Sequence, residues 1–121
     1  MKRHEIGILG ERVAASYLRS NGYRIVETNY RCPYGEIDII AQKDGTLVFV
    51  EVRTKTSTLY GSPEESITRT KMEHLLAVAD DFAAGHPNLP EDRRIDVIAV
   101  RLDPDGQLSN IEHIRNAVEG R

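Results

Sequence analysis

The sequence predicts an α/β fold in the order α-β-β-β-α-β, with a mixed central sheet flanked by helices. Three observations support it: a helical apolar stripe near the N-terminus, two apolar runs around Asp44-Gly45 that are typical of a hairpin, and a second helical pattern before a last apolar run. A helical crossover within one sheet joins parallel strands, so we expect the third and fourth strands to be parallel. The length of 121 residues indicates a single domain, 1–121.

The first helix is expected from Glu5 to Ser20, and it ends at Asn21-Gly22, a favourable C-terminal cap. Its apolar stripe contains Ile6, Leu9, Val13, Ala14, Tyr17 and Leu18. Gly7 and Gly10 lie on the same stripe and would let the helix approach a sheet closely. Glu11 lies at the edge of the stripe, where its carboxylate either faces solvent or leans over the surface on which the helix packs.

The remaining elements follow from short patterns. The first strand is expected at Tyr23 to Tyr30, the hairpin strands at about Glu36–Gln42 and Leu47–Thr54, and a strand buried on both faces from Ile95. The second helix is predicted to begin at Ser62, with Pro63 at its first position and Glu65 completing a capping box, and to end near Ala84. After a turn at 103–106, the tail reads as a strand followed by a helical turn.

The hairpin places charged residues in register. A two-residue turn at Asp44-Gly45 sets Asp38 directly opposite Glu51, with both side chains on one face. The other face is wholly apolar and is expected to be buried; it contains Ile37, Ile39, Ala41, Val48, Val50 and Val52. The face with the acids changes along its length from apolar to charged, in the order Ile40, Leu47 and Phe49, then Asp38 and Glu51, then Glu36 opposite Arg53, and Lys55.

Two carboxylates directly opposed across a strand pair repel each other. Three arrangements could offset that repulsion: ion pairs with Arg53 or Lys55 in a structural cluster, a proton shared between the acids, or a divalent cation bound to both. Mg²⁺ prefers oxygen ligands and usually takes one or two carboxylates from a protein. The pattern supplies that number, and the three arrangements remain open at this point.

Composition limits the function classes. The net charge of −3 argues against coating nucleic acid by charge alone, so such a partner would need a local basic patch or bound cations. No apolar run approaches the ~20 residues of a membrane span, and charged residues interrupt any signal-peptide pattern at the start. A single cysteine, Cys32, excludes an internal disulfide and fits a cytoplasmic protein. The histidines have no metal-ligand spacing and are expected at the surface or at caps: His4, His74, His86 and His113.

Several segments in order resemble a known nuclease group. They are "GERVAASYL", "GEIDIIA", "VFVEVRTK", "SITRTK" and "RIDVIAV". Together they resemble the PD-(D/E)xK nuclease superfamily, and most closely its YraN-like family of endonuclease-like proteins, which is similar to archaeal Holliday-junction resolvases. The resemblance covers nearly the whole chain and implies a restriction-endonuclease-like αβββαβ core.

The resemblance also implies roles for individual residues. Asp38 and Glu51 would bind Mg²⁺ or Mn²⁺ together with the backbone carbonyl of Val52, and Glu11 would join directly or through water. The basic residue two positions after the glutamate is usually lysine in such nucleases, and here it is Arg53. Because arginine stays protonated, it can clamp a phosphate but cannot act as a general base.

Two lysines could take the role of the missing one. Lys55 has the same facing parity as Arg53, and Lys71 lies on the second helix, from which some branches of the group supply their lysine. The alternative for Lys71 is a side chain whose stem covers apolar surface. The residues expected to contact nucleic acid are Arg31, Arg53, Lys55, Arg69 and Lys71.

The function implied is metal-dependent phosphodiester hydrolysis. The nucleic-acid substrate would be DNA, and branched DNA is one form that it could take. The resemblance to resolvases, which act as dimers, also makes a homodimer an expectation. Two other classes stay open: a nucleic-acid-binding module without hydrolysis, favoured by Arg53 at the lysine position, and a structural or interaction domain in which the charged residues form a salt cluster.

Overall fold

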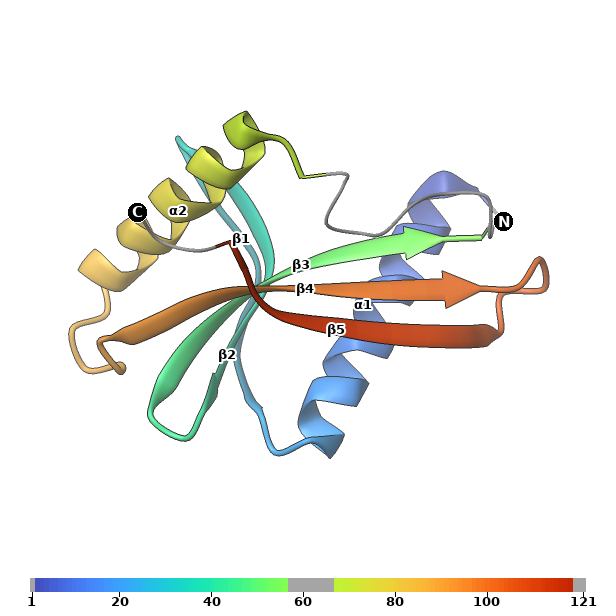
Figure 1. Ribbon diagram of the computed structural model, residues 1–121, viewed down its shortest axis with the longest axis horizontal. Helices are drawn as coiled ribbons and strands as arrows, with labels where there is room; N and C mark the ends of the chain where they lie inside the picture. The colour runs from blue at the N-terminus through green and yellow to red at the C-terminus, as the bar shows by residue number, and fades with distance from the viewer. Residues whose placement is uncertain (1, 57–66, 119–121) are drawn as a thin grey trace.

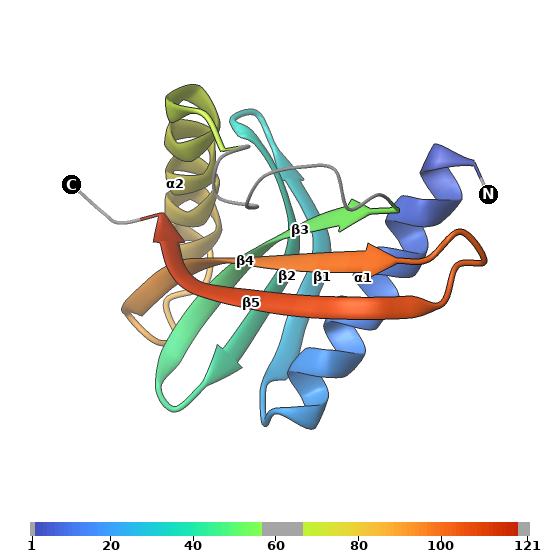
Figure 2. The same ribbon diagram turned by 45° about the vertical axis from the view of Figure 1, so that its right-hand side comes forward.

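The protein is a five-stranded sheet with one helix on each face (Figures 1 and 2). It is seen in a computed structural model that describes residues 2–56 and 67–118. The elements are α1 (Arg3–Ser20), β1 (Arg24–Cys32), β2 (Gly35–Lys43), β3 (Thr46–Lys55), α2 (Arg69–Ala84), β4 (Asp92–Leu102) and β5 (Leu108–Val118). The strand order in the sheet is the order in the chain.

The sheet is mixed, as predicted. β3 and β4 run parallel, joined through α2, and the other neighbouring strands are antiparallel. The α/β class and the αβββαβ order are therefore confirmed. The helical turn predicted in the tail is wrong, because that segment continues as β5 and supplies hydrogen-bond partners to the outer edge of β4.

The hairpin turn has the predicted geometry. Asp44 and Gly45 have φ angles of 50° and 77°, and two successive positive φ angles are typical of the type I′ turn that suits a two-residue hairpin. The pairing runs in the predicted register from Lys43↔Thr46 to Ile39↔Val50.

The sheet separates two apolar cores. On the α1 side, helix residues pack on Ile39, Ala41, Val48, Val50 and Ile98. On the α2 side, Leu75, Val78 and Phe82 pack on Ile37, Ile40, Leu47 and Phe49. Ile37 thus lies on the face opposite to the predicted one, and the path of β2 described below gives the reason.

Two details of the helices differ from the prediction: the role of Gly7 in α1 and the first residue of α2. A Cβ at Gly10 would lie 1.9 Å from Oγ1 of Thr54, so this glycine does permit the close approach of α1 to β3, whereas nothing lies within 4 Å of the same position at Gly7. α2 begins at Arg69, where the hydroxyl of Thr68 accepts a hydrogen bond from the Lys71 N–H. It therefore starts later than predicted, and the proposed capping box at 62–65 lies outside the described residues.

Candidate functional site

The hairpin ladder ends where Asp38 enters it. Along an antiparallel ladder, pairs that exchange backbone hydrogen bonds alternate with pairs that do not. After Ile39↔Val50, the next backbone hydrogen bonds would therefore join residue 37 to residue 52. Instead, the Val52 N–H donates a 2.7 Å hydrogen bond to Oδ2 of Asp38. The aspartate side chain has taken the place of a backbone acceptor, and the β2–β3 pairing stops there. We call Asp38, Glu51 and Val52 the junction site.

The hydrogen bond from Val52 to the Asp38 side chain goes with three corrections to the predictions. Ile37 packs in the α2-side core although Ile39 packs in the α1-side core, which breaks the expected alternation at Asp38. The predicted pairing of Glu36 with Arg53 does not form, since the described ladder has ended; Glu36 faces Arg31 of β1 and forms a 3.0 Å ion pair with it. The predicted pair Asp38–Glu51 is likewise absent from the described ladder, which ends one step before it.

Asp38 is an acid in an unfavourable place for charge. Burial, the largest cause, and the neighbouring Glu51, Glu11 and Glu36 together raise its pKa to about 7, against the lowering effect of the hydrogen bond from Val52. These acids are therefore near enough to repel it. A carboxyl group that titrates near neutral pH inside a polar depression is a frequent mark of a functional site.

Glu51 is held differently. It is 7% exposed, and its Oε2 lies 3.4 Å from Nη2 of Arg53 and 3.5 Å from Nζ of Lys71. The structure thus brings together residues from β3 and α2, as an ion cluster centred on Glu51. Within the described part of the chain, the buried Nε of Arg53 has no hydrogen-bond partner, so a ligand or water that supplied an acceptor there would satisfy it.

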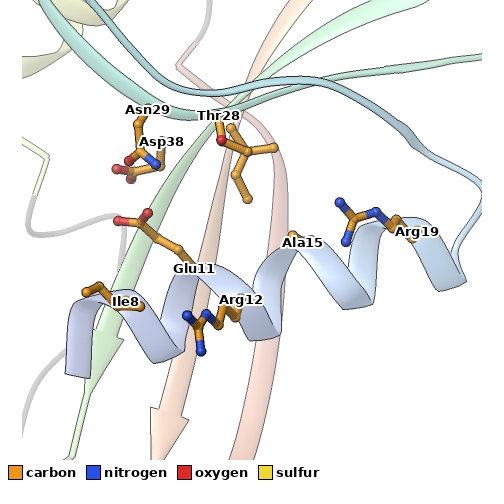
Figure 3. A pocket seen from close by; sticks show the side chains of 9 residues that line it. Ile8, Glu11, Arg12, Ala15, Arg19, Thr28, Asn29 and Asp38 are labelled. Atoms are coloured by element: carbon orange, nitrogen blue, oxygen red, sulfur yellow. The ribbon is translucent and has the colours of Figure 1, made fainter. Parts of the chain in front are cut away.

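Glu11 reaches the site from α1. Figure 3 shows its carboxylate turned toward Asp38 and Asn29 across a groove of about 330 Å³. Burial raises the pKa of Glu11, and Glu36 and Glu51 raise it further, while His4 lowers it. Of the two predicted positions for this residue, the structure shows the one in which it leans over the sheet. The groove is lined by Ile8, Glu11, Arg12, Ala15, Arg19, Thr28, Asn29, Asp38 and Ile39.

The other predicted contacts lie at the ends of their elements. Arg69 is exposed at the first position of α2, and Lys55 is exposed at the end of β3. Arg31 is exposed and already paired with Glu36. Of the five predicted nucleic-acid contacts, Arg53 and Lys71 form ion pairs with Glu51 of the junction site.

The donor set at the junction fits a small, hard cation. Among the described residues, no three His, Cys, Asp or Glu side chains come close enough to hold a metal ion, so Glu11 does not complete a three-carboxylate ligand set. Two carboxylates, Asp38 and Glu51, with the carbonyl of Val52, match what Mg²⁺ usually takes from a protein, the rest being water. Burial first and the neighbouring acids second disfavour the ionised form of Asp38, and a divalent cation would favour that form.

A second buried acid was missed in the sequence. Asp96 of β4 is 0% exposed and accepts hydrogen bonds from Nε of Arg94 at 3.0 and 3.2 Å, Nε2 of His113 at 2.8 Å and the Asn116 N–H at 2.9 Å. We call these four residues the Asp96 network. The expectation of a surface position for His113 is wrong, since its side chain is 5% exposed. The signal was an acid inside the apolar run of β4, two residues after an arginine that shares its face.

Neither helix that the structure describes has the length and apolar content to cross a lipid bilayer.

Comparisons with known proteins identify relatives over nearly the whole chain. The model of the uncharacterised protein family UPF0102 matches residues 10–100. A UPF0102 protein of Roseiflexus castenholzii is 46% identical over 120 residues, which is 98% of this chain and 96% of the relative. One from Syntrophomonas wolfei is 42% identical over 113 residues, covering 93% and 96% of the two chains.

Among solved structures, a FdxN element excision controlling factor protein from Anabaena variabilis aligns with 85% of this chain and 97% of its own. Its sequence identity is 11% and its TM-score is 0.40. A similarity at this level carries no information about function.

Proposed function

The chain belongs to the uncharacterised protein family UPF0102, the YraN family, and from that premise we propose that it is a metal-dependent nuclease that hydrolyses phosphodiester bonds in nucleic acid. The observation that carries the proposal is Asp38, which interrupts the β2–β3 ladder and lies half-buried near other carboxylates with a pKa raised to about 7. A fold tolerates such a residue at a cost in stability, and binding a cation there would repay it.

The junction site would hold Mg²⁺ or Mn²⁺ through Asp38, Glu51 and the Val52 carbonyl. When bound, the ion lowers the pKa of a water molecule and offsets charge on the attacked phosphate. The Val52 N–H fixes Oδ2 of Asp38, which leaves Oδ1 as the oxygen free to bind a ligand. Glu11, turned toward Asp38 in Figure 3, is placed to orient a water molecule.

The two cations beside Glu51 divide the remaining work. The guanidinium of Arg53 offers several N–H donors in a plane, which suits the clamping of phosphate oxygens but not the movement of a proton. Lys71 touches the same carboxylate oxygen from α2, and an ammonium group can both orient a water and give up a proton. We therefore assign to Lys71 the role that a lysine at position 53 would have.

The substrate part of the proposal is DNA, in branched form by resemblance to the resolvases. A second candidate is binding of nucleic acid without hydrolysis. It is favoured by one observation: Glu51 already has both Arg53 and Lys71 as partners, and these compete with a metal ion for its oxygen.

Two measurements on purified protein test the proposal. Cleavage of branched, single-stranded and duplex DNA is followed with Mg²⁺, with Mn²⁺ and with EDTA, and thermal unfolding is followed over a Mg²⁺ titration. The variants are Asp38→Asn, Glu51→Gln and Lys71→Ala, with Glu73→Gln as a control because Glu73 is an exposed acid on the same helix as Lys71.

We expect metal-dependent cleavage that falls at least 100-fold in the first three variants and stays within twofold in Glu73→Gln. At a Mg²⁺ concentration ten times its Kd, the wild type should gain about 1.4 kcal/mol of stability, and Asp38→Asn should lose this gain. Binding of DNA that survives the substitutions without any cleavage would support the second candidate. If the protein neither binds nor cleaves DNA, and Mg²⁺ does not change its thermal unfolding, the result would favour a structural domain.

A further inference from the structure

The groove between α1 and the sheet has a charged outer part that the junction site does not use. Five of its lining residues come from α1 and follow one another along the helix from Ile8 to Arg19 (Figure 3). Glu11 faces Asp38 at one end. Arg12 and Arg19 are both exposed, and their separation of two helical turns is about 10 Å along the axis.

These two arginines differ from four others that the structure describes. Arg31, Arg53, Arg93 and Arg94 each form an ion pair with a carboxylate. Within residues 2–56 and 67–118, neither Arg12 nor Arg19 has an ion pair or a hydrogen bond from its side chain. Two unpaired guanidinium groups along one groove are available to an anionic ligand.

The remaining residues that line the groove are apolar or uncharged and polar. Ile8, 40% exposed, offers an apolar surface at one wall. Thr28 and Asn29 of β1 offer hydroxyl and amide groups at the other. A nucleotide presents a phosphate, the flat face of its base and the polar edges of that base, and a single strand exposes all three.

We propose that this groove binds one strand of the nucleic-acid substrate, with Arg12 and Arg19 contacting its phosphates and leading it to Asp38. The inference rests on the proposed function and adds to it a path for the substrate and a class, the unpaired strand. About 10 Å of helix axis matches the rise of roughly three stacked nucleotides at 3.4 Å each.

The test measures binding alone. Fluorescence anisotropy in EDTA follows a labelled twelve-nucleotide single strand, as DNA and as RNA, and a duplex of the same sequence. The proteins compared are the wild type, Arg12→Ala, Arg19→Ala and the double variant. Arg115→Ala is the matched control, because Arg115 is exposed on β5, at the sheet edge opposite to β1. Thermal unfolding checks that each variant is folded.

We expect the wild type to bind a single strand more tightly than the duplex, and the double variant to bind it about tenfold more weakly. Two lost phosphate contacts should also make the slope of log K against log salt shallower by about 1.4. Arg115→Ala should change affinity less than twofold. The DNA and RNA arms decide which strand is preferred.

Unchanged affinity in the double variant, an equal loss in Arg115→Ala, or no measurable strand binding by the wild type would each overturn the inference. Because EDTA prevents hydrolysis, these results do not depend on catalysis. Cleavage with unchanged strand binding in the double variant would overturn the groove assignment and leave the proposed function standing. Arginine-dependent binding without cleavage would do the reverse.

Discussion

Two aspartates of one sheet, the half-buried Asp38 of β2 and the buried Asp96 of β4, have opposite properties. Asp96 is 0% exposed and is surrounded by donors, from Arg94, His113 and Asn116. Burial alone would raise its pKa, but these hydrogen bonds and the charge of Arg94 outweigh burial and the pKa is lowered. Asp38 has one N–H donor and several carboxylate neighbours, and its pKa is raised to about 7.

The difference shows which of the two carboxylates the protein itself compensates with hydrogen-bond donors and positive charge, and which it does not. At Asp96, every oxygen has a partner from the protein itself, so the residue fastens β5 to β4 and needs nothing more. At Asp38, neighbouring acids raise the pKa and the Val52 N–H donates to the carboxylate, whereas the cations Arg53 and Lys71 pair with Glu51. A buried charge that the protein does not compensate is a site where a ligand can do so.

The largest effect that can separate the two sites is removal of Asp96. Asp96→Ala leaves the Arg94 guanidinium and the His113 ring without their shared acceptor inside the protein. We expect a loss of about 3–5 kcal/mol in the free energy of unfolding, as for other broken buried ion pairs, measured by urea denaturation at pH 7.5. Asp92→Ala, at an exposed position of the same strand, should change stability by less than about 0.5 kcal/mol.

A loss below about 1 kcal/mol in Asp96→Ala would show that the network contributes little. In that case the contrast with Asp38 would reflect burial alone rather than completed hydrogen bonding.

Asp38→Asn should act in the opposite direction. The folded protein binds the Asp38 proton more tightly than the unfolded chain does, because the pKa rises from 3.8 to about 7 on folding. The free energy of unfolding contributed by this residue therefore falls as pH rises from about 4 to about 7, and the penalty is complete above that. Asparagine avoids the charge and can still accept the Val52 N–H, so the variant should be more stable at pH 8 by about 1–3 kcal/mol.

Urea denaturation at several pH values in EDTA checks this prediction. The advantage of Asp38→Asn should shrink as the pH is lowered and vanish below about pH 4, where the carboxyl group is protonated in both states. Glu73→Gln, at an exposed site on α2, should show no such pH dependence. An asparagine variant less stable than the wild type at pH 8 would mean that the ionised carboxylate is already compensated by the protein.

The order of elements and the hairpin register could be predicted because both depend on local rules. Asp44-Gly45 fixes the turn type, and the turn fixes the pairing as far as Ile39↔Val50. The next step could not be predicted, since there a side chain replaces a backbone acceptor. Strand alternation contains no information on that exchange, and so Ile37 was assigned to the wrong face.

The junction site can be predicted from the sequence more completely than the Asp96 network. Asp38 and Glu51 lie a few residues from a recognisable turn, so their proximity follows from the hairpin, and the contribution of Glu51 to the raised pKa of Asp38 agrees with it. The Asp96 network joins β4 to a tail whose strand was only half recognised. His113 has no metal-ligand spacing in the sequence, so no pattern predicts that it is buried against Asp96.

The smallest effect concerns the outer member of the Asp96 network. Nε2 of His113 donates to Asp96 at 2.8 Å, which leaves Nδ1 to accept from the Tyr17 hydroxyl at 3.0 Å. Tyr17→Phe removes that hydroxyl and keeps the ring that packs edge-on against the histidine. We expect a loss of about 0.5–1.5 kcal/mol, the value of one hydrogen bond, measured by urea denaturation. Tyr34→Phe, at a position 54% exposed, is the control and should be neutral within about 0.5 kcal/mol. A loss in Tyr17→Phe as large as in Asp96→Ala would mean that the hydroxyl, rather than the carboxylate, is the centre of the network.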